Sequence, residues 1–129
     1  MNEPEAGTPG RPERRREARF RPPPSLRLTV RAPGLRAWFD RSERALVDCS
    51  QLGIAWIDPE PPEIGEVVIC DLKGGGWSLR GIPCYVRVVD RLVRDFRVGV
   101  EFRRELLPAR RARKLAMALA DLDTGTLGG

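Results

Sequence analysis

Two arginines and an acidic turn are the residues whose types and spacing point to chemistry. Arg15 and Arg19 are separated by three residues, and Asp48, Ser50 and Gly53 follow within the stretch DCSQLG. An arginine can donate two hydrogen bonds to guanine O6 and N7, or form a charged pair with a phosphate. A carboxylate such as Asp48 can accept from the N–H edge of guanine that faces the other way. Arginines and one acid could therefore cover opposite edges of the same base.

The turn that contains Asp48 has a second interpretation that needs no ligand. Ser50 could offer an adaptable hydroxyl, and Gly53 could supply a positive φ or let a ligand approach the backbone closely. Asp and Ser also build ordinary turns between strands, with Gly53 merely closing the corner. The arginine spacing is equally open, because Arg11 and Arg15 give a second match in a chain with 21 arginines.

The composition permits anionic partners and counts against a hydrolytic enzyme, although arginine enrichment alone decides little. The 129 residues suit one domain, and a net charge of +5 with 21 Arg against 2 Lys fits anionic partners. Because the chain has no His, it cannot form a Ser-His or Cys-His nucleophile pair. Cys49, Cys70 and Cys84 lie on apolar runs without C-x-x-C spacing, which disfavours zinc and disulfides. We therefore expect no catalysis, no metal and no cofactor.

The chain shows no sequence signal for a membrane. No apolar stretch approaches the ~20 residues that span a bilayer, and the first residues lack the apolar core of a signal peptide. We expect a cytoplasmic protein without a membrane span.

The sequence pattern predicts that mainly β-strands position these side chains. Residues 1–25 are rich in proline and poor in apolar residues, so we expect a flexible tail that carries the arginines. From Leu26 apolar and polar residues alternate, as a half-buried strand requires. Further strand-like runs lie at 35–39, 45–49, 53–57, 66–72, 77–90 and 95–102. Short strands at this spacing predict an antiparallel barrel or sandwich.

The longest run and the end of the chain carry further signals. Pro83 interrupts the run 77–90, which predicts a bulge or an edge position there. Pro108 stands where a helix could begin, and the residues after it repeat at helical spacing, which predicts an amphipathic helix of roughly 14 residues. The apolar face of this helix carries Ala112, Leu115, Leu119 and Leu122. Residues 123–129 should fray.

Two other groups of residues are given no ligand-binding role. The basic face of the helix, interpreted as a solvated surface, carries Arg110, Arg111, Arg113 and Lys114. Trp38, Trp56 and Trp77 lie on strand-like runs and are expected in the core or at a barrel rim.

In their order along the chain, these motifs resemble the signature of PilZ domains, R-x-x-x-R followed by [D/N]-x-S-x-x-G. The run 95–102 ends in RVGVEF, similar to the closing G-V-x-F strand of that family, and a helix follows. The resemblance covers roughly residues 13–120. It favours Arg15 with Arg19 over Arg11 with Arg15, because Phe20 and the first strand then follow at a family-like distance.

The resemblance implies an all-β fold with a C-terminal helix: a six-stranded antiparallel barrel that, with its helix, takes up residues 26–122. It implies a bacterial receptor that binds cyclic di-GMP on the outer face of the barrel, with the arginine segment folding over the ligand as a switch. The ligand contacts would be Arg15, Arg19, Asp48, Ser50 and Gly53, with Arg14 and Arg16 as secondary contacts. The proline run 22–24 is a departure from many family members, because it could limit how the tail folds back.

Three functional hypotheses remain open at this point. In the first, liganded protein docks on an unidentified downstream protein, with motility, adhesion, biofilm or polysaccharide output as family-level implications. In the second, the chain is a PilZ-like adaptor without ligand, for instance in pilus assembly; the intact site residues count against it. In the third, a small basic barrel binds nucleic acid. This is disfavoured because the basic tail lacks interleaved aromatics and because acids lie in or near the turns, namely Asp48, Asp58, Glu60 and Glu63.

Overall fold

The computed structural model describes residues 18–32 and 43–124 of the chain. The elements in chain order are β1 (Arg27–Arg31), β2 (Glu43–Cys49), β3 (Gly53–Asp58), β4 (Val67–Gly74), β5 (Trp77–Arg91), β6 (Phe96–Phe102), the 3-10 helix η2 (Arg104–Leu106) and helix α2 (Ala109–Thr124). The strand predicted at 35–39, Trp38 within it, and residues 125–129 of the terminal tail lie outside the described residues.

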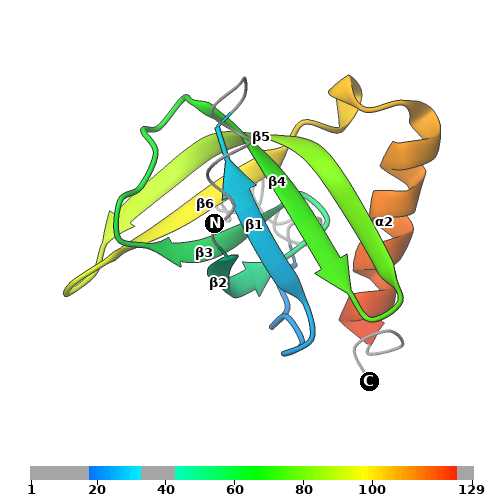
Figure 1. The fold of residues 1–129 in the computed structure, drawn as a ribbon, viewed down its shortest axis with the longest axis horizontal. Coiled ribbons are helices and arrows are strands. Elements are labelled where there is room, and N and C mark those ends of the chain that lie inside the picture. Colours follow the sequence, from blue (N-terminus) through cyan, green and yellow to red (C-terminus); the bar gives the residue numbers. More distant parts are fainter. Residues whose placement is uncertain (1–17, 33–42, 125–129) are drawn as a thin grey trace, which may run out of the picture.

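The six strands form a closed antiparallel barrel in the order β1-β2-β3-β6-β5-β4 (Figure 1). Each of these strands pairs with a neighbour on both sides, which removes the exposed edges that invite aggregation. The longest strand, β5, has 15 residues and pairs with both β4 and β6. The prediction of a six-stranded antiparallel barrel is confirmed.

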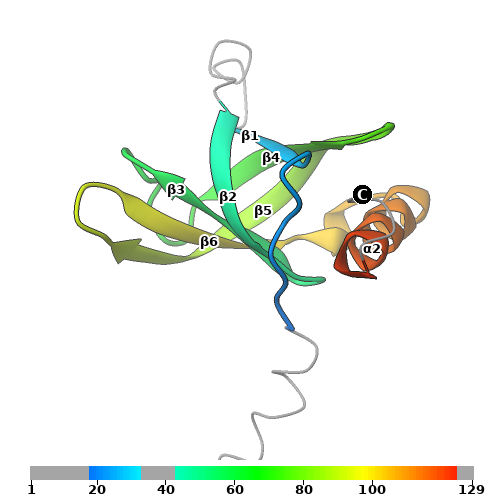
Figure 2. The same ribbon diagram turned by 90° about the horizontal axis from the view of Figure 1, so that it is seen from below.

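One core fills the barrel and extends to the helix. The alternation predicted from Leu26 onward is present, because Leu28 and Val30 are buried whereas Arg27 is exposed. Trp56 of β3 is fully buried among the barrel side chains. Helix α2 contributes Leu115 and other apolar residues to the same cluster. Figures 1 and 2 both show α2 beside the barrel, on the side of the β4–β5 hairpin, where it covers the core.

The C-terminal helix begins and runs much as the sequence predicts. It has 16 residues and starts directly after Pro108, whose carbonyl accepts from the N–H of Ala112 at 2.9 Å. Proline suits this place because the first turn of a helix needs no N–H donor there. The helix ends at Thr124. Within the described ranges, no helix is long and apolar enough to cross a membrane.

Two β-bulges lie in the strands β2 and β5, the first of them next to the expected site residue Asp48. In β2 the pairing with β3 shifts between Leu46 and Asp48, which leaves Val47 as the extra residue. In β5 the pairing with β6 shifts between Val86 and Val88, which leaves Arg87 as the extra residue. A bulge bends its strand and re-aims the side chains beside it. Both bulges therefore act on the orientation of charged residues, Asp48 and Arg87.

Of the two alternatives predicted for Pro83, a bulge or an edge position, the bulge is wrong and the edge position agrees with the pairing. The irregularity lies two residues earlier, where Arg80 and Gly81 stand opposite the single residue Asp71 of β4. Gly81 has a φ of 71°, and its N–H donates to the Asp71 carboxylate at 2.6 Å, which fixes the bulge. Pro83 itself keeps its partner in β4. The β5–β6 ladder ends at Cys84, so Pro83 needs no N–H toward β6.

The segment before β1 returns to the barrel wall. The N–H of Phe20 donates to the carbonyl of Cys49 at 2.8 Å, and the N–H of Cys49 donates back at 3.0 Å. The proline run does not prevent this return, because it forms a turn in which the N–H of Leu26 donates to the carbonyl of Pro23 at 3.0 Å. In Figure 2 this segment, drawn in blue, passes across the end of β2. Arg19 is thereby held next to the last residues of β2.

Candidate functional site

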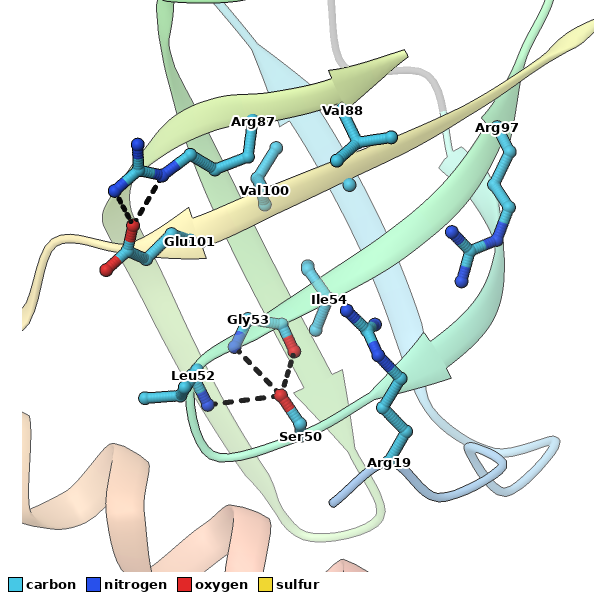
Figure 3. A pocket seen from close by; sticks show the side chains of 11 residues that line it. Arg19, Ser50, Leu52, Gly53, Ile54, Arg87, Val88, Arg97, Val100 and Glu101 are labelled. Atoms are coloured by element: carbon cyan, nitrogen blue, oxygen red, sulfur yellow. Dashed lines mark hydrogen bonds and ion pairs between the residues drawn. The ribbon is translucent and has the colours of Figure 1, made fainter. Parts of the chain in front are cut away.

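A pocket of about 380 Å³ lies on the barrel wall where β3, β5 and β6 run side by side. Figure 3 shows the 50–53 turn along one side of it and the side chain of Arg19 reaching over it. The residues that line it are Arg19, Ser50, Leu52, Gly53, Ile54, Arg87, Val88, Arg97, Gly99, Val100 and Glu101. Three arginines and two motif residues of the turn thus share one pocket.

Two arginines meet at one carboxylate beside this pocket. Asp48 Oδ2 accepts from Arg19 Nη1 at 3.1 Å and from Arg97 Nη2 at 2.9 Å. The Asp48 side chain is only 18% exposed, whereas that of Arg19 is 49% exposed. In Figure 3 the guanidinium groups of Arg19 and Arg97 point toward one another above Ile54. The end of β2, the start of β6 and the segment before β1 therefore build one charged cluster.

This cluster retains unused hydrogen-bonding capacity. Both arginines use the same carboxylate oxygen, and no donor among the described residues contacts Asp48 Oδ1. A guanidinium carries five N–H donors in a planar fork, and a carboxylate can accept at about four positions. Arg19, Asp48 and Arg97 can thus offer donors and an acceptor to a third group while remaining paired to each other.

A second ion pair borders the pocket on β5 and β6. Glu101 Oε1 accepts from Arg87 Nε at 2.7 Å and from Arg87 Nη2 at 2.6 Å. Counting Arg19 and Arg97 against Asp48, this part of the molecule carries three cations and two carboxylates. One positive charge remains uncompensated, which favours an anionic ligand.

The neighbouring thiol adds no charge to the site. Burial, and secondarily the Asp48 carboxylate, raises the pKa of Cys49 to about 12, so the thiol stays protonated at neutral pH. Cys49, Cys70 and Cys84 are all buried and free. In the part of the chain that the structure describes, no cluster of His, Cys, Asp or Glu could hold a metal ion.

Ser50 builds the turn from inside. Its Oγ accepts from the N–H of Leu52 at 3.1 Å and of Gly53 at 3.2 Å, and it donates to the Gly53 carbonyl at 3.3 Å. These three contacts, drawn in Figure 3, occupy a buried hydroxyl. The turn-building interpretation therefore accounts for the Ser50 hydroxyl, which also lines the pocket wall.

One of the two reasons given for Gly53, a positive φ, is wrong. Gly65, Gly76 and Gly81 have positive φ, but Gly53 does not. A Cβ on Gly53 would stand 1.8 Å from the backbone oxygen of Val100. Glycine is therefore required here because β6 passes close to β3.

The turn is also joined to the C-terminal helix. Gln51 Nε2 donates to the carbonyl of Ala116 in α2 at 2.9 Å. Arg104 of η2 donates to Gln51 Oε1 at 2.7 Å and also to the Gln51 backbone carbonyl. Desolvation lowers the pKa of Arg104 below its usual value, which marks a cation partly withdrawn from water. The sequence alone did not assign Gln51 or Arg104 any role.

The structure brings together four of the residues singled out in the sequence, namely Arg19, Asp48, Ser50 and Gly53. Arg14, Arg15 and Arg16 lie outside the described residues.

Sequence reasoning missed Arg97, Arg87 and Glu101 as neighbours of this group. A signal for two of them existed, because Arg97 and Glu101 alternate with the buried Val98 and Val100 and must face outward.

A model of the PilZ domain family matches residues 13–117. The chain belongs to the PilZ domain family. Comparison with curated protein sequences gave no significant match. The resemblance inferred from the arginine pair, the Asp48 turn and the closing strand is thus confirmed at the level of the family.

Two solved structures resemble this PilZ domain. An uncharacterized protein from Legionella has 13% sequence identity and a TM-score of 0.55, with 83% of this chain and 95% of that chain covered. YcgR from Escherichia coli, solved in complex with c-di-GMP, has 19% identity and a TM-score of 0.62. The match covers 87% of this chain but 47% of YcgR, so the chain spans about half of that protein. At these identities the likeness concerns the fold.

Proposed function

We propose that this PilZ domain is a non-catalytic receptor that binds cyclic di-GMP at the pocket over β3, β5 and β6. The observation that carries the proposal is the pair of guanidinium groups, Arg19 and Arg97, that converge on Asp48 beside this pocket in a chain of the PilZ family. The fold shared with YcgR, whose structure contains c-di-GMP, supports the same ligand.

The chemistry of the cluster fits guanine and phosphate together. The ligand has two guanines and two phosphates. The free donors of Arg19 and Arg97 can serve guanine O6 and N7 or a phosphate oxygen, and Asp48 Oδ1 can accept from the opposite N–H edge of the base. Guanine has one edge that accepts hydrogen bonds and one that donates them, so a site for it requires a cationic donor close to an acidic acceptor.

In this proposal the residues that precede Arg19 supply the remaining positive charge. The ligand carries two negative charges, and the described residues of the site leave one positive charge uncompensated. Arg15, with Arg14 and Arg16 as secondary contacts, would add cations from the segment that precedes Arg19. Ser50 and Gly53 would act through the shape of the turn, since the Ser50 hydroxyl is engaged within it.

Binding of the ligand would act as a signal by fixing the arginine segment over it. Fixing a chain segment costs conformational entropy, so ligand binding and the arrangement of the arginine segment would be thermodynamically coupled. The liganded form would then present a changed surface to a downstream protein.

Calorimetric titration with cyclic di-GMP tests the proposal. We expect the parent protein to bind, and Arg19→Ala and Asp48→Ala each to lose at least about 30-fold in affinity, because a charged hydrogen bond to a partly buried group is removed. Asp48→Asn keeps the shape and one acceptor, so it should weaken binding while preserving the fold.

The matched control is Arg27→Ala. Arg27 is also an arginine in an exposed ion pair, with Glu43 at 3.1 Å, but it does not line the pocket. Its removal changes the net charge equally and should leave affinity within about twofold of the parent. The proposal is wrong if the parent protein fails to bind, or if affinity is unchanged in both Arg19→Ala and Asp48→Ala.

A further inference from the structure

A second hollow, of about 410 Å³, lies between helix α2 and the β4–β5 hairpin. We name it the helix–hairpin groove; its residues are Gly75, Gly76, Trp77, Arg110, Arg113, Lys114, Met117, Ala118 and Asp121. We propose that the helix–hairpin groove binds a segment of a partner protein in which an apolar side chain is flanked by carboxylates.

The floor of the groove is apolar and accessible. Met117 is 61% exposed, although it lies one position before Ala118, which is buried in the core. Trp77 is half-buried beside it, and its indole lies so close to Gly74 that a Cβ there would stand 2.4 Å from Nε1. Met and Trp are flexible or large side chains that favour partner surfaces, and an exposed apolar floor gains free energy when it is covered.

The rim of the groove is cationic and available. Arg110, Arg113 and Lys114 are exposed, and within the described ranges none of them forms an ion pair. Together with Met117 they follow the i, i+3, i+4, i+7 spacing of one helix face. Their charge is offset in the groove by Asp121 alone. From the sequence this face was interpreted as solvated; the apolar hollow beside it is what favours a partner.

The shape and charge favour a protein segment over other anionic partners. A bilayer surface needs apolar side chains that protrude, whereas Met117 lies in a hollow bordered by long cationic side chains. Nucleic acid would contact the cations through its phosphates and leave the floor at Met117 uncovered. An apolar side chain with nearby Asp or Glu satisfies both the floor and the rim.

The groove is joined to the nucleotide pocket by one side chain. Gln51, in the turn of the proposed ligand site, donates to the carbonyl of Ala116, which directly precedes Met117. Insofar as the proposed function holds, a ligand-induced change in the turn would reach the groove through this contact. Peptide binding itself depends only on the groove.

The test uses the full chain and synthetic, fluorescently labelled 12-residue peptides, each with one central Leu, Phe or Trp between pairs of Glu. We expect at least one peptide to bind by fluorescence anisotropy. Met117→Ser and Arg113→Glu should each weaken it at least about tenfold, since each removes part of the floor or reverses a rim charge. The control peptides replace Glu by Lys, or the central residue by Ser, and should not bind.

Two variants far from the groove serve as matched controls. Val93→Ser and Arg94→Glu change the same residue chemistry at exposed positions of the β5–β6 loop and should leave affinity unchanged. Titrations with and without cyclic di-GMP are run separately, so a failure of nucleotide binding is distinguishable from a failure of the groove.

Three outcomes would overturn the proposal. The first is that no peptide binds, or that the Lys peptides bind as well as the Glu peptides. The second is that vesicles of phosphatidylglycerol or a single-stranded DNA oligomer bind instead, in a way that Met117→Ser and Arg113→Glu abolish. The third is sedimentation of the parent as a dimer that Met117→Ser dissociates, since a second copy would then occupy the groove.

Discussion

Gly53 is surrounded by backbone rather than by open space. An added Cβ would stand 1.8 Å from the carbonyl oxygen of Val100 and 3.2 Å from the Cα of Glu101. Because these are backbone atoms of β6, they cannot rotate away as a flexible side chain could. A motif glycine beside a proposed ligand pocket is thus required first by the packing of two strands.

We therefore predict that Gly53→Ala destabilises the protein. The free energy of unfolding, measured by urea denaturation, should fall by about 1–3 kcal/mol or more, because β3 and β6 must separate. Gly99→Ala is the control, since its Cβ would meet Val88 Cβ at an ordinary 3.6 Å. That variant should stay within about 0.5 kcal/mol of the parent in stability. Equal stabilities for parent and Gly53→Ala would contradict the steric argument.

The control variant Gly99→Ala also tests the position of the proposed ligand. Gly99 lines the pocket and lies between the buried Val98 and Val100, so it faces outward. The methyl group of Gly99→Ala should occupy pocket volume and lower the affinity for cyclic di-GMP by calorimetry, while stability is retained. Unchanged affinity would mean that the ligand does not approach this part of β6.

Individual residues also show what the sequence could and could not predict about the site. Asp48 and Arg19 were identified because motif spacing along the chain marks them. Arg97 was missed because its contact with Asp48 depends on the strand order, in which β3 pairs with both β2 and β6 and so brings the start of β6 near the end of β2. Among 21 arginines, only the strand register selects this one.

At the scale of elements, the 50–53 turn and helix α2 form one connected unit. Gln51 joins them by accepting from Arg104 and donating to Ala116. Arg104 also donates to the backbone of Gln51. The turn is therefore supported from the helix side as well as by its own Ser50 hydrogen bonds.

We predict that Gln51→Ala loosens this unit. The variant removes one acceptor from the partly buried Arg104 and one donor from Ala116, so unfolding should require about 1–2 kcal/mol less free energy. Amide hydrogen exchange in α2 should accelerate, as measured by mass spectrometry, because the helix loses a contact with the turn. Arg110→Ala, on the exposed face of the same helix, is the control and should not change it. Unaltered exchange in Gln51→Ala would rule out this mechanical link.

The elements themselves followed closely from patterns in the sequence. Strand-like runs at 45–49, 53–57 and 95–102 correspond to β2, β3 and β6 within about two residues, because alternation or apolar runs mark the buried faces. The bulge at Val47 was not predicted, since it exists only relative to the partner strand β3. The bulge at Arg80 and Gly81 was not predicted for the same reason; of the bulge or edge position expected at Pro83, only the edge position agrees with the pairing.

At the scale of the whole molecule, the net charge of +5 raises the question of nonspecific binding to polyanions. Several of the cations are paired with carboxylates in the described residues, for example in the pairs Arg31–Asp71 and Arg44–Asp58, so the excess of positive charge must lie elsewhere. Among the described residues, the pocket carries one positive charge in excess, and the helix–hairpin groove carries three cations against Asp121.

We predict a shallow salt dependence for cyclic di-GMP binding. A ligand with two phosphates should lose less than about tenfold in affinity between 50 and 200 mM salt, whereas proteins with six to ten phosphate contacts on DNA lose about 10³–10⁵-fold. Calorimetry at both concentrations measures this, with Asp48→Ala as a variant that should reduce nucleotide binding at each. A steep salt dependence that is insensitive to Asp48→Ala would instead support nucleic-acid binding.

The two hydrogen bonds between Phe20 and Cys49 limit how far Arg15 can move from the pocket. Arg15 precedes Phe20 by five residues, so the covalent chain keeps its Cα within about 18 Å of the residue that these bonds fix on the barrel. A side chain held by so short a tether has an effective concentration near the pocket on the order of millimolar, and this value does not change when the protein is diluted. If the proposed function holds, closure of Arg15 over a nucleotide already bound in the pocket is a first-order event within one molecule, and its rate is independent of protein concentration.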